Sequence, residues 1–469
     1  MLTYFPKFFS TRAIICYVVT LAAVSAFFIR YAMPFQFVLF GFVFVVVFFN
    51  YSTKLTMDWR RYNPKTFTKK LFITALWIRV IYVIFIYFYY IEMTGLPHMY
   101  YPGDELIYHF VGTMFKEVGR NEFGNLLKDY DFVFSDFGYC WWLGIEYSLL
   151  GTHVLPARLL KCVIDAFSCV LIYSLAKRNF GESTGRIAAV FCMLMPNMWY
   201  YCGLTLKETE MAFLTILFVE RADLAIHSKM ISIKSLLFPF IIALVMFTFR
   251  TALAAVLVAA LVAALVLSSG RQLELWKKVL YTSLFAVWMF LTVGVEMIQE
   301  TQALWSGRTE NQSVGYEWRA QRTGGNQFAK YATASVFAPL IFTIPFSSMV
   351  ATQGQENQLL LHGGNFIKNI LSGLTILALF LLLVRGDWRK HVLPLAVMGG
   401  YLVVLVFSNF AHSERFHFPV LALELMFAAY GVSQLTNKHK RWYTLWLVGI
   451  SVANIAWAWI KLAGRGYRI

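Results

Sequence analysis

Long apolar runs separated by short polar loops recur along almost the whole chain of 469 residues. A run of about 17–25 apolar residues is the length that an α-helix needs to cross the hydrocarbon core of a bilayer. The composition agrees, because only 14% of the residues are charged, whereas soluble domains carry roughly 25%. The sequence therefore predicts an all-α polytopic membrane protein.

The apolar runs predict about 13 transmembrane helices. They lie near residues 13–29, 34–50, 71–92, 157–176, 187–204, 207–224, 235–249, 251–268, 279–297, 364–384, 392–409, 418–435 and 442–460. The run 235–249 is short for a bilayer core of about 30 Å, so it and the next run are expected to form a tight hairpin that turns at Arg250. Basic residues precede the first run without an obvious small-residue cleavage site, which favours a retained span over a signal peptide.

The net charge of +16 is concentrated in three short loops. Their basic residues are Lys54, Arg60, Arg61, Lys65, Lys69, Lys70, Lys177, Arg178, Arg186, Lys438, Lys440 and Arg441. The positive-inside rule explains such loops as cytoplasmic anchors, so the charge does not point to nucleic acid as a partner. The six cysteines show no CxxC spacing and indicate neither a disulfide framework nor a metal site.

Two long loops are expected on the opposite, non-cytoplasmic side, at residues 94–156 and 298–363. In the first, Phe137–Leu150 is apolar and rich in tryptophan but too short to span, which is typical of an interfacial helix. In the second, Ala334–Val350 is apolar and contains two prolines, which favours a re-entrant or surface-lying element.

The acidic pair Asp104-Glu105 lies at the start of the first long loop. A carboxylate beside a membrane cavity can act as a general base on a substrate hydroxyl. The alternatives are a solvated loop pair or a helix cap, because Asp104 directly precedes a helix-like run whose free N–H groups it could satisfy.

Three further groups of charged residues are expected on the same side of the membrane. Arg158 begins a span, where it could bind a phosphate or extend its charge to the interface. Lys207-Glu208 lies at a turn between two spans, where the pair could contact substrate or its two opposite charges could neutralise each other. Arg415 and His417 lie in another outer turn, where they could bind an anionic headgroup or form a plain polar turn.

A metal site at this last turn is less favoured, because only His412, Glu414 and His417 would be available as ligands. We therefore predict no metal site and no cofactor, and leave a weakly bound divalent cation open. Taken together, the four groups describe one cavity that contains acids for catalysis and cations for a phosphate.

The order of these elements resembles the GT-C glycosyltransferases of the protein O-mannosyltransferase and aminoarabinose transferase superfamily. The local match covers about residues 95–225. It comprises Gly103-Asp104-Glu105-Leu-Ile-Tyr108, Leu149-Leu150-Gly151, Arg158-Leu159, Tyr173-Ser-Leu-Ala176-Lys177-Arg178-Asn-Phe180-Gly181, Pro196 and Glu208. The element from Arg415 to Pro419 resembles the late helices of the same families, whereas the two spans before the acidic loop are additional.

The resemblance implies a polyprenyl-phosphate sugar as donor and a glycan, lipid or protein as acceptor. By the same analogy Asp104 is the general base, Glu105 supports it and Arg158 holds the lipid phosphate. Lys207, Glu208, Arg415 and His417 are expected to contact substrate. The expected location is the cytoplasmic (inner) membrane, with the site facing outward and acting on cell-envelope glycan.

We thus expect a glycosyltransferase that comprises four regions: an N-terminal extension (1–70), a transmembrane core (71–297), an external loop (298–363) and C-terminal helices (364–469). One alternative is a flippase or transporter for lipid-linked glycans, which would use the same cations without catalysis. Another is a polysaccharide polymerase or ligase that uses a lipid-diphosphate donor.

Overall fold

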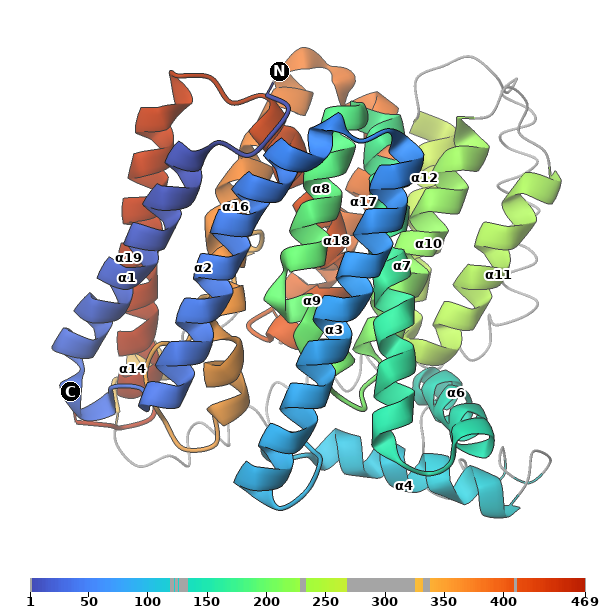
Figure 1. Ribbon diagram of the computed structural model, residues 1–469, viewed down its shortest axis with the longest axis horizontal. Coiled ribbons are helices and arrows are strands. Elements are labelled where there is room, and N and C mark those ends of the chain that lie inside the picture. The colour runs from blue at the N-terminus through green and yellow to red at the C-terminus, as the bar shows by residue number, and fades with distance from the viewer. Residues whose placement is uncertain are drawn as a thin grey trace.

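The computed structural model describes residues 2–118, 122, 125, 134–227, 233–267, 325–331, 338–408 and 411–468. Within these ranges the chain forms α-helices joined by short turns, and none of the described residues lies in a β-strand. Most helices run side by side in one bundle, while two of them lie across one end of it (Figure 1).

The first half of the chain forms α1 (Lys7–Phe27), α2 (Phe35–Asp58), α3 (Pro64–Thr94), α4 (Gly103–Val118), α6 (Phe134–Leu150), α7 (Val154–Phe180), α8 (Glu182–Leu194), α9 (Pro196–Cys202) and α10 (Glu208–Ile226). The rest forms α11 (Ile233–Phe249), α12 (Thr251–Leu267), α14 (Gln327–Tyr331), α16 (Glu356–Arg385), α17 (Val392–Phe407), α18 (Glu414–Ser433) and α19 (His439–Ala463). Single 3-10 turns lie at Ile29–Tyr31, Trp59–Arg61, Ala338–Leu340 and Asp387–His391.

Eight of the described helices are long and apolar enough to cross a membrane, namely α1, α2, α3, α7, α16, α17 with the turn before it, α18 and α19. The shorter apolar helices α11 and α12 form the predicted hairpin that turns at Arg250. These features confirm an all-α polytopic membrane protein. The span expected at 279–297 lies outside the described residues, so the count of about 13 helices stays a prediction.

One expected span is wrong. The run 187–204 is not one helix, because α8 ends at Leu194 and α9 begins at Pro196. Proline lacks the N–H that would continue the helix, and its ring disfavours a helical conformation of the residue before it. Met195 accordingly has an extended backbone, with φ −69° and ψ 115°.

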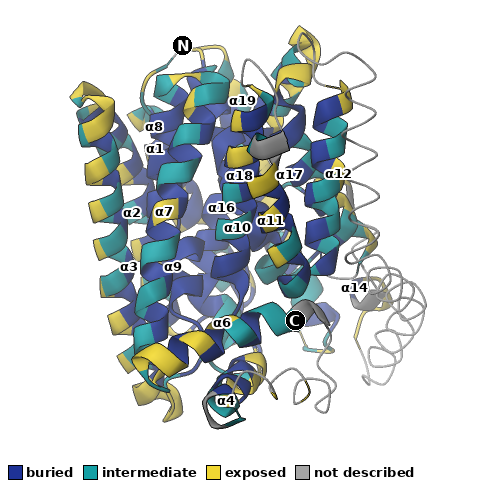
Figure 2. Ribbon diagram, turned by 90° about the vertical axis from the view of Figure 1, so that its right-hand side faces the viewer, coloured by how far each residue is buried: buried dark blue, intermediate teal, exposed yellow. Residues whose placement is uncertain are grey.

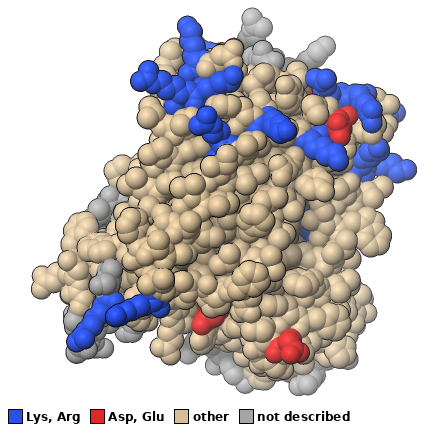
Figure 3. All heavy atoms as spheres, turned by 60° about the vertical axis from the view of Figure 1, so that its left-hand side comes forward, with Lys and Arg blue, Asp and Glu red and all other residues tan. Residues whose placement is uncertain are grey.

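The two ends of the bundle differ in charge. Most lysine and arginine side chains visible in Figure 3 gather at its uppermost end, above a broad band that is largely free of charge, while a smaller group lies with acidic side chains at the opposite end. Arg186 donates to the carbonyls of Trp59 and Tyr62 and so joins two of the basic loops, while Lys440 of the third lies over the ring of Phe8 near the start of α1. We call the end that carries these loops the basic end, and the opposite end, crossed by α4 and α6, the α4 end (Figure 1).

The α6 helix confirms the short helix expected within Phe137–Leu150. The expected element at Ala334–Val350 is described from residue 338 and is buried, non-helical backbone beyond its first turn. The amide of Asn369 donates to the carbonyls of Thr343 (2.6 Å) and Pro345 (2.9 Å). Such partners allow irregular backbone inside a membrane protein, which agrees with the re-entrant alternative.

Buried residues fill the centre of the bundle and exposed residues lie on its outer faces (Figure 2). Many of the exposed residues are large and apolar. The centre also contains a charged pair that is fully buried, Arg79 of α3 with Asp165 of α7. Arg79 also donates to the carbonyls of Ala75 (3.1 Å), Cys192 (3.3 Å) and Met193 (3.4 Å). This guanidinium therefore connects α3, α7 and α8 within the bundle.

We predict that Asp165→Leu lowers the free energy of unfolding by about 3–5 kcal/mol, because it leaves Arg79 buried without its counter-ion. The double variant Arg79→Leu, Asp165→Leu should recover most of that loss, since it removes both charges. Unfolding in mixed detergent micelles measures both values. Asp387→Leu, at a surface ion pair with Lys390, is the control and should change nothing measurable. A single variant as stable as wild type would contradict the prediction.

Candidate functional site

The guanidinium of Arg415 bridges two carboxylates at the α4 end. Arg415 lies in the first turn of α18, where Nη1 pairs with Asp104 of α4 and Nε pairs with Glu208 of α10. Three of the four predicted groups of charged residues therefore contribute to one cluster, although they are far apart in the sequence. We call Asp104, Glu208 and Arg415 the Arg415 bridge.

The two carboxylates of the bridge differ in exposure. The Asp104 side chain is 52% exposed, whereas that of Glu208 is 1% exposed. Asp104 also lies in the first turn of α4, where a negative charge interacts favourably with the helix dipole. Asp104 is thus the member that a substrate can reach, while Glu208 anchors the guanidinium from inside.

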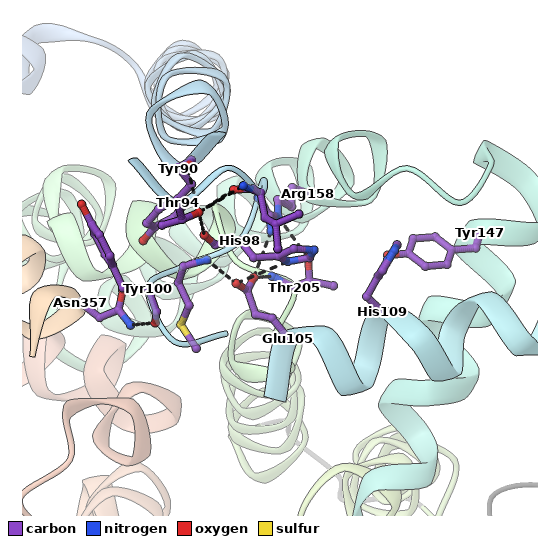
Figure 4. A network of polar contacts seen from close by, with 12 residues as sticks. Tyr90, Thr94, His98, Tyr100, Glu105, His109, Tyr147, Arg158, Thr205 and Asn357 are labelled. Atoms are coloured by element: carbon purple, nitrogen blue, oxygen red, sulfur yellow. Dashed lines mark hydrogen bonds and ion pairs between the residues drawn. The ribbon is translucent and has the colours of Figure 1, made fainter. Parts of the chain in front are cut away.

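The neighbouring Glu105 is fully buried and its carboxylate is held on several sides (Figure 4). Oε1 accepts hydrogen bonds from Arg158 Nη2 (3.1 Å) and from the backbone N–H of Thr205. Oε2 accepts from the N–H of Met99 (2.8 Å) and lies 3.7 Å from His98 Nδ1. Burial alone would raise the pKa of Glu105, but the charge of Arg158 and these hydrogen bonds outweigh it and lower the pKa.

Arg158 is equally buried, and its Nε donates to Thr205 Oγ1 (3.2 Å). It therefore has a carboxylate partner and does not extend to the membrane interface. The Glu105–Arg158 pair fixes the start of α4 to α7 and to the turn before α10. The catalytic role expected of Glu105 and the phosphate contact expected of Arg158 stay predictions, and their geometry favours a positioning role.

Lys207 contacts a residue that the sequence did not single out. Its Nζ pairs with Asp136 of α6 and donates to the carbonyl of Phe249 (2.8 Å), so its main partner is not the adjacent glutamate. Burial lowers the pKa of Lys207, and Asp136 offsets part of that effect. Asp136 also accepts a hydrogen bond from Tyr108 of α4 (2.8 Å). Lys207 thus joins α6, α10 and α11 beside the Arg415 bridge.

His417 points away from the bridge. It is buried in α18, where Nε2 contacts the carbonyl oxygen of Ala411 (2.8 Å) and Nδ1 contacts Nζ of Lys368 (2.9 Å). The structure therefore does not bring His417 together with Arg415, and its substrate contact stays a prediction. Among the described residues, no cluster of three or more His, Cys, Asp or Glu side chains could hold a metal ion.

A second buried ionic cluster was not predicted as a site. Lys161 of α7 pairs with Glu210 of α10 (3.3 Å) and donates to Tyr139 Oη (3.1 Å). Burial and the nearby charge of Glu210 raise the pKa of Glu146, in α6, to about 8, with Lys161 opposing the shift. In the sequence, Lys161, Glu210 and Glu146 are charged residues within or beside apolar segments. Such residues are candidates for a functional role in a membrane protein.

Two family models match the chain. Residues 137–295 match the family described as dolichyl-phosphate-mannose-protein mannosyltransferase, and residues 356–462 match the Alg9-like mannosyltransferase family. No curated protein matches the chain. The two matches confirm the expected resemblance to the GT-C glycosyltransferases and support glycosyltransferase activity in a membrane protein. They include Glu208 and Arg415, whereas Asp104 lies outside both.

We predict that Glu146→Gln stabilises the protein increasingly as the pH rises from 5 to 8. A carboxyl whose pKa is raised on folding keeps its proton in the folded state, so wild-type stability falls with pH between the unfolded pKa and about 8. In wild type, Glu146 lowers the free energy of unfolding by at most about 1.4 kcal/mol per pH unit in this range, and the variant should remove this dependence. Thermal unfolding at a series of pH values measures it. A difference between variant and wild type that does not change with pH would contradict the prediction.

Proposed function

From the resemblance to the GT-C glycosyltransferases, we propose that this protein transfers a sugar from a polyprenyl-phosphate donor to an acceptor hydroxyl. Both matching families are described as mannosyltransferases, so mannose is the first sugar to test. The observation that carries the proposal is the Arg415 bridge, in which a half-exposed carboxylate is held by a guanidinium at one end of a membrane bundle.

Asp104 is the proposed general base. Its carboxylate takes the proton of the acceptor hydroxyl while the hydroxyl oxygen attacks the anomeric carbon of the sugar. The bond from that carbon to the phosphate oxygen breaks, and the polyprenyl phosphate leaves with the bonding electrons. Because Asp104 is half exposed, it can return the proton to solvent, and Arg415 holds its carboxylate in place throughout.

Arg250 is the proposed contact for the departing phosphate. It lies at the turn between α11 and α12, with its guanidinium 4.3 Å from the ring centroid of Phe416, the residue after Arg415. Among the described residues no carboxylate lies within ion-pairing distance of Arg250, whereas Arg158 is already paired with Glu105. A guanidinium fork matches phosphate oxygens, so it can stabilise the charge of the leaving group.

A lipid donor is supported by an apolar groove between α2 and α3. The groove has a volume of about 470 Å³, and its lining includes Phe40, Val43, Ile81, Phe85 and Trp199. Several of these side chains are exposed on spanning helices, where the surrounding solvent is lipid. The α3 helix continues from this groove to the Glu105 network (Figure 4), which favours an isoprenoid chain as its occupant.

The site is proposed to face away from the cytoplasm. Short loops rich in lysine and arginine remain on the cytoplasmic side of a membrane, which assigns the basic end to that side. The Arg415 bridge lies at the opposite end, with α4. A flippase, the alternative from another class, would need its cations along a path between both ends.

We predict that Asp104→Asn reduces sugar transfer by roughly 10²–10⁴-fold, because the amide cannot accept the proton. Transfer from radiolabelled polyprenyl-phosphate mannose to an acceptor extract measures this, and binding of the same donor should persist. Glu92→Gln removes an exposed carboxylate of α3 and serves as the matched control, with wild-type activity expected.

Normal turnover by Asp104→Asn would refute the assignment of the base. Arg250→Gln should instead weaken donor binding by about 10–100-fold, the effect of losing one charge-assisted hydrogen bond. Translocation of the lipid by the wild-type protein without any transfer would favour the flippase.

A further inference from the structure

A small polar cavity lies beside the first turn of α18, between α16, α18 and α19. Its volume is about 180 Å³, and its lining includes Ser348, Gln358, Asn365, Glu414, Trp457 and Lys461. Part of its wall is the buried non-helical segment around residues 345–348. Glu414 lines the cavity, and the next residue, Arg415, forms the Arg415 bridge. The cavity and the bridge are therefore neighbours.

Lys461 organises the polar side of this cavity without being available to an anion. Its Nζ donates to Gln358 Oε1 (2.6 Å), Ser348 Oγ (2.9 Å) and Gln355 Oε1 (3.1 Å). An ammonium group has three N–H bonds, so three neutral oxygens use its whole donor capacity. The carboxylate of Glu414 in the same lining would also repel an anion.

Three amide groups and one carboxylate of the lining can face a ligand. Lys461 donates to the oxygens of Gln355 and Gln358, and the oxygen of Asn365 accepts from Asn197 (3.1 Å). Their NH₂ groups have no hydrogen-bond partner among the described residues and can donate, while the carboxylate of Glu414 can accept. Each hydroxyl of a ligand both donates and accepts, so this set matches a neutral, hydroxyl-rich molecule.

An aromatic wall completes the cavity. The ring of Trp457 stacks on that of His412, with ring centroids 5.3 Å apart and planes 30° apart. Phe346, which also lines the cavity, lies beside Trp457, with 6.2 Å between the ring centroids. A pyranose ring has faces of C–H groups and a rim of hydroxyls, so it fits an apolar wall combined with a few placed polar groups.

We propose that this cavity binds one pyranose ring. Its volume corresponds to about six water molecules at about 30 Å³ each, which suits a single sugar unit. The sugar belongs to the donor or to a glycosylated acceptor, since both present the same chemistry. The inference rests on the proposed function for the presence of a sugar, but its test requires no catalytic activity.

Binding is measured on the full-length protein in nanodiscs by saturation-transfer NMR, with the methyl α-glycosides of mannose, glucose and galactose as probes. At least one probe should bind wild type and bind about tenfold more weakly to Gln358→Leu, which loses a hydrogen-bond donor. Trp457→Leu should have a similar effect. Trp446→Leu, on the same helix but outside the cavity lining, is the matched control and should bind as wild type does.

The proposal is overturned if no probe binds wild type, if both cavity variants bind unchanged, or if inorganic phosphate displaces the probe. Thermal unfolding shows whether each variant is folded. If Trp457→Leu does not fold, Gln358→Leu still tests the proposal. Loss of probe binding in Gln358→Leu, with no sugar transfer by wild type, would support the cavity and refute the proposed function.

The source of the sugar follows from a comparison of two lipids. If Gln358→Leu weakens binding of polyprenyl-phosphate mannose but not of polyprenyl phosphate, the cavity holds the donor sugar. If both lipids bind unchanged while the glycoside no longer binds, the cavity holds a sugar of the acceptor.

Discussion

The ion pairs of Arg415 hold together three parts of the chain that are far apart in sequence. They connect α4, which lies across the end of the bundle, with α10 and α18 inside it. Without the guanidinium, Glu208 would be a buried charge without compensation, which costs several kcal/mol. The same interaction that stabilises this end of the bundle therefore places a reachable carboxylate at its surface.

Asp104 and Glu105 show how neighbours in sequence acquire different roles. Successive residues of an α-helix point about 100° apart, so one helix start can direct one carboxylate outward and the next inward. Glu105 is fully buried against Arg158, whereas Asp104 is half exposed beside Arg415. The inner pair fixes the helix start, and the outer carboxylate is then held where a substrate can approach.

The sequence predicted the class of fold and the shared side of the charged groups, because hydropathy and loop charge follow directly from the membrane as solvent. It did not predict which charges pair. Lys207 pairs with Asp136, and Arg79 with Asp165, through contacts that only the packing of distant helices creates. Pro196 is visible in the sequence as a helix breaker, but the continuous apolar run around it led to the prediction of one span where the structure has two helices. The polar cavity was not predictable, since its lining comes from segments more than 100 residues apart.

The central claim is that Asp104 and Arg415 act as one unit in sugar transfer. A double-mutant cycle of Asp104→Asn and Arg415→Gln, measured as kcat/KM with polyprenyl-phosphate mannose, tests it most directly. We predict strong non-additivity, with the double variant losing no more activity than the more impaired single variant. Losses that simply multiply would show two independent residues and would contradict the claim.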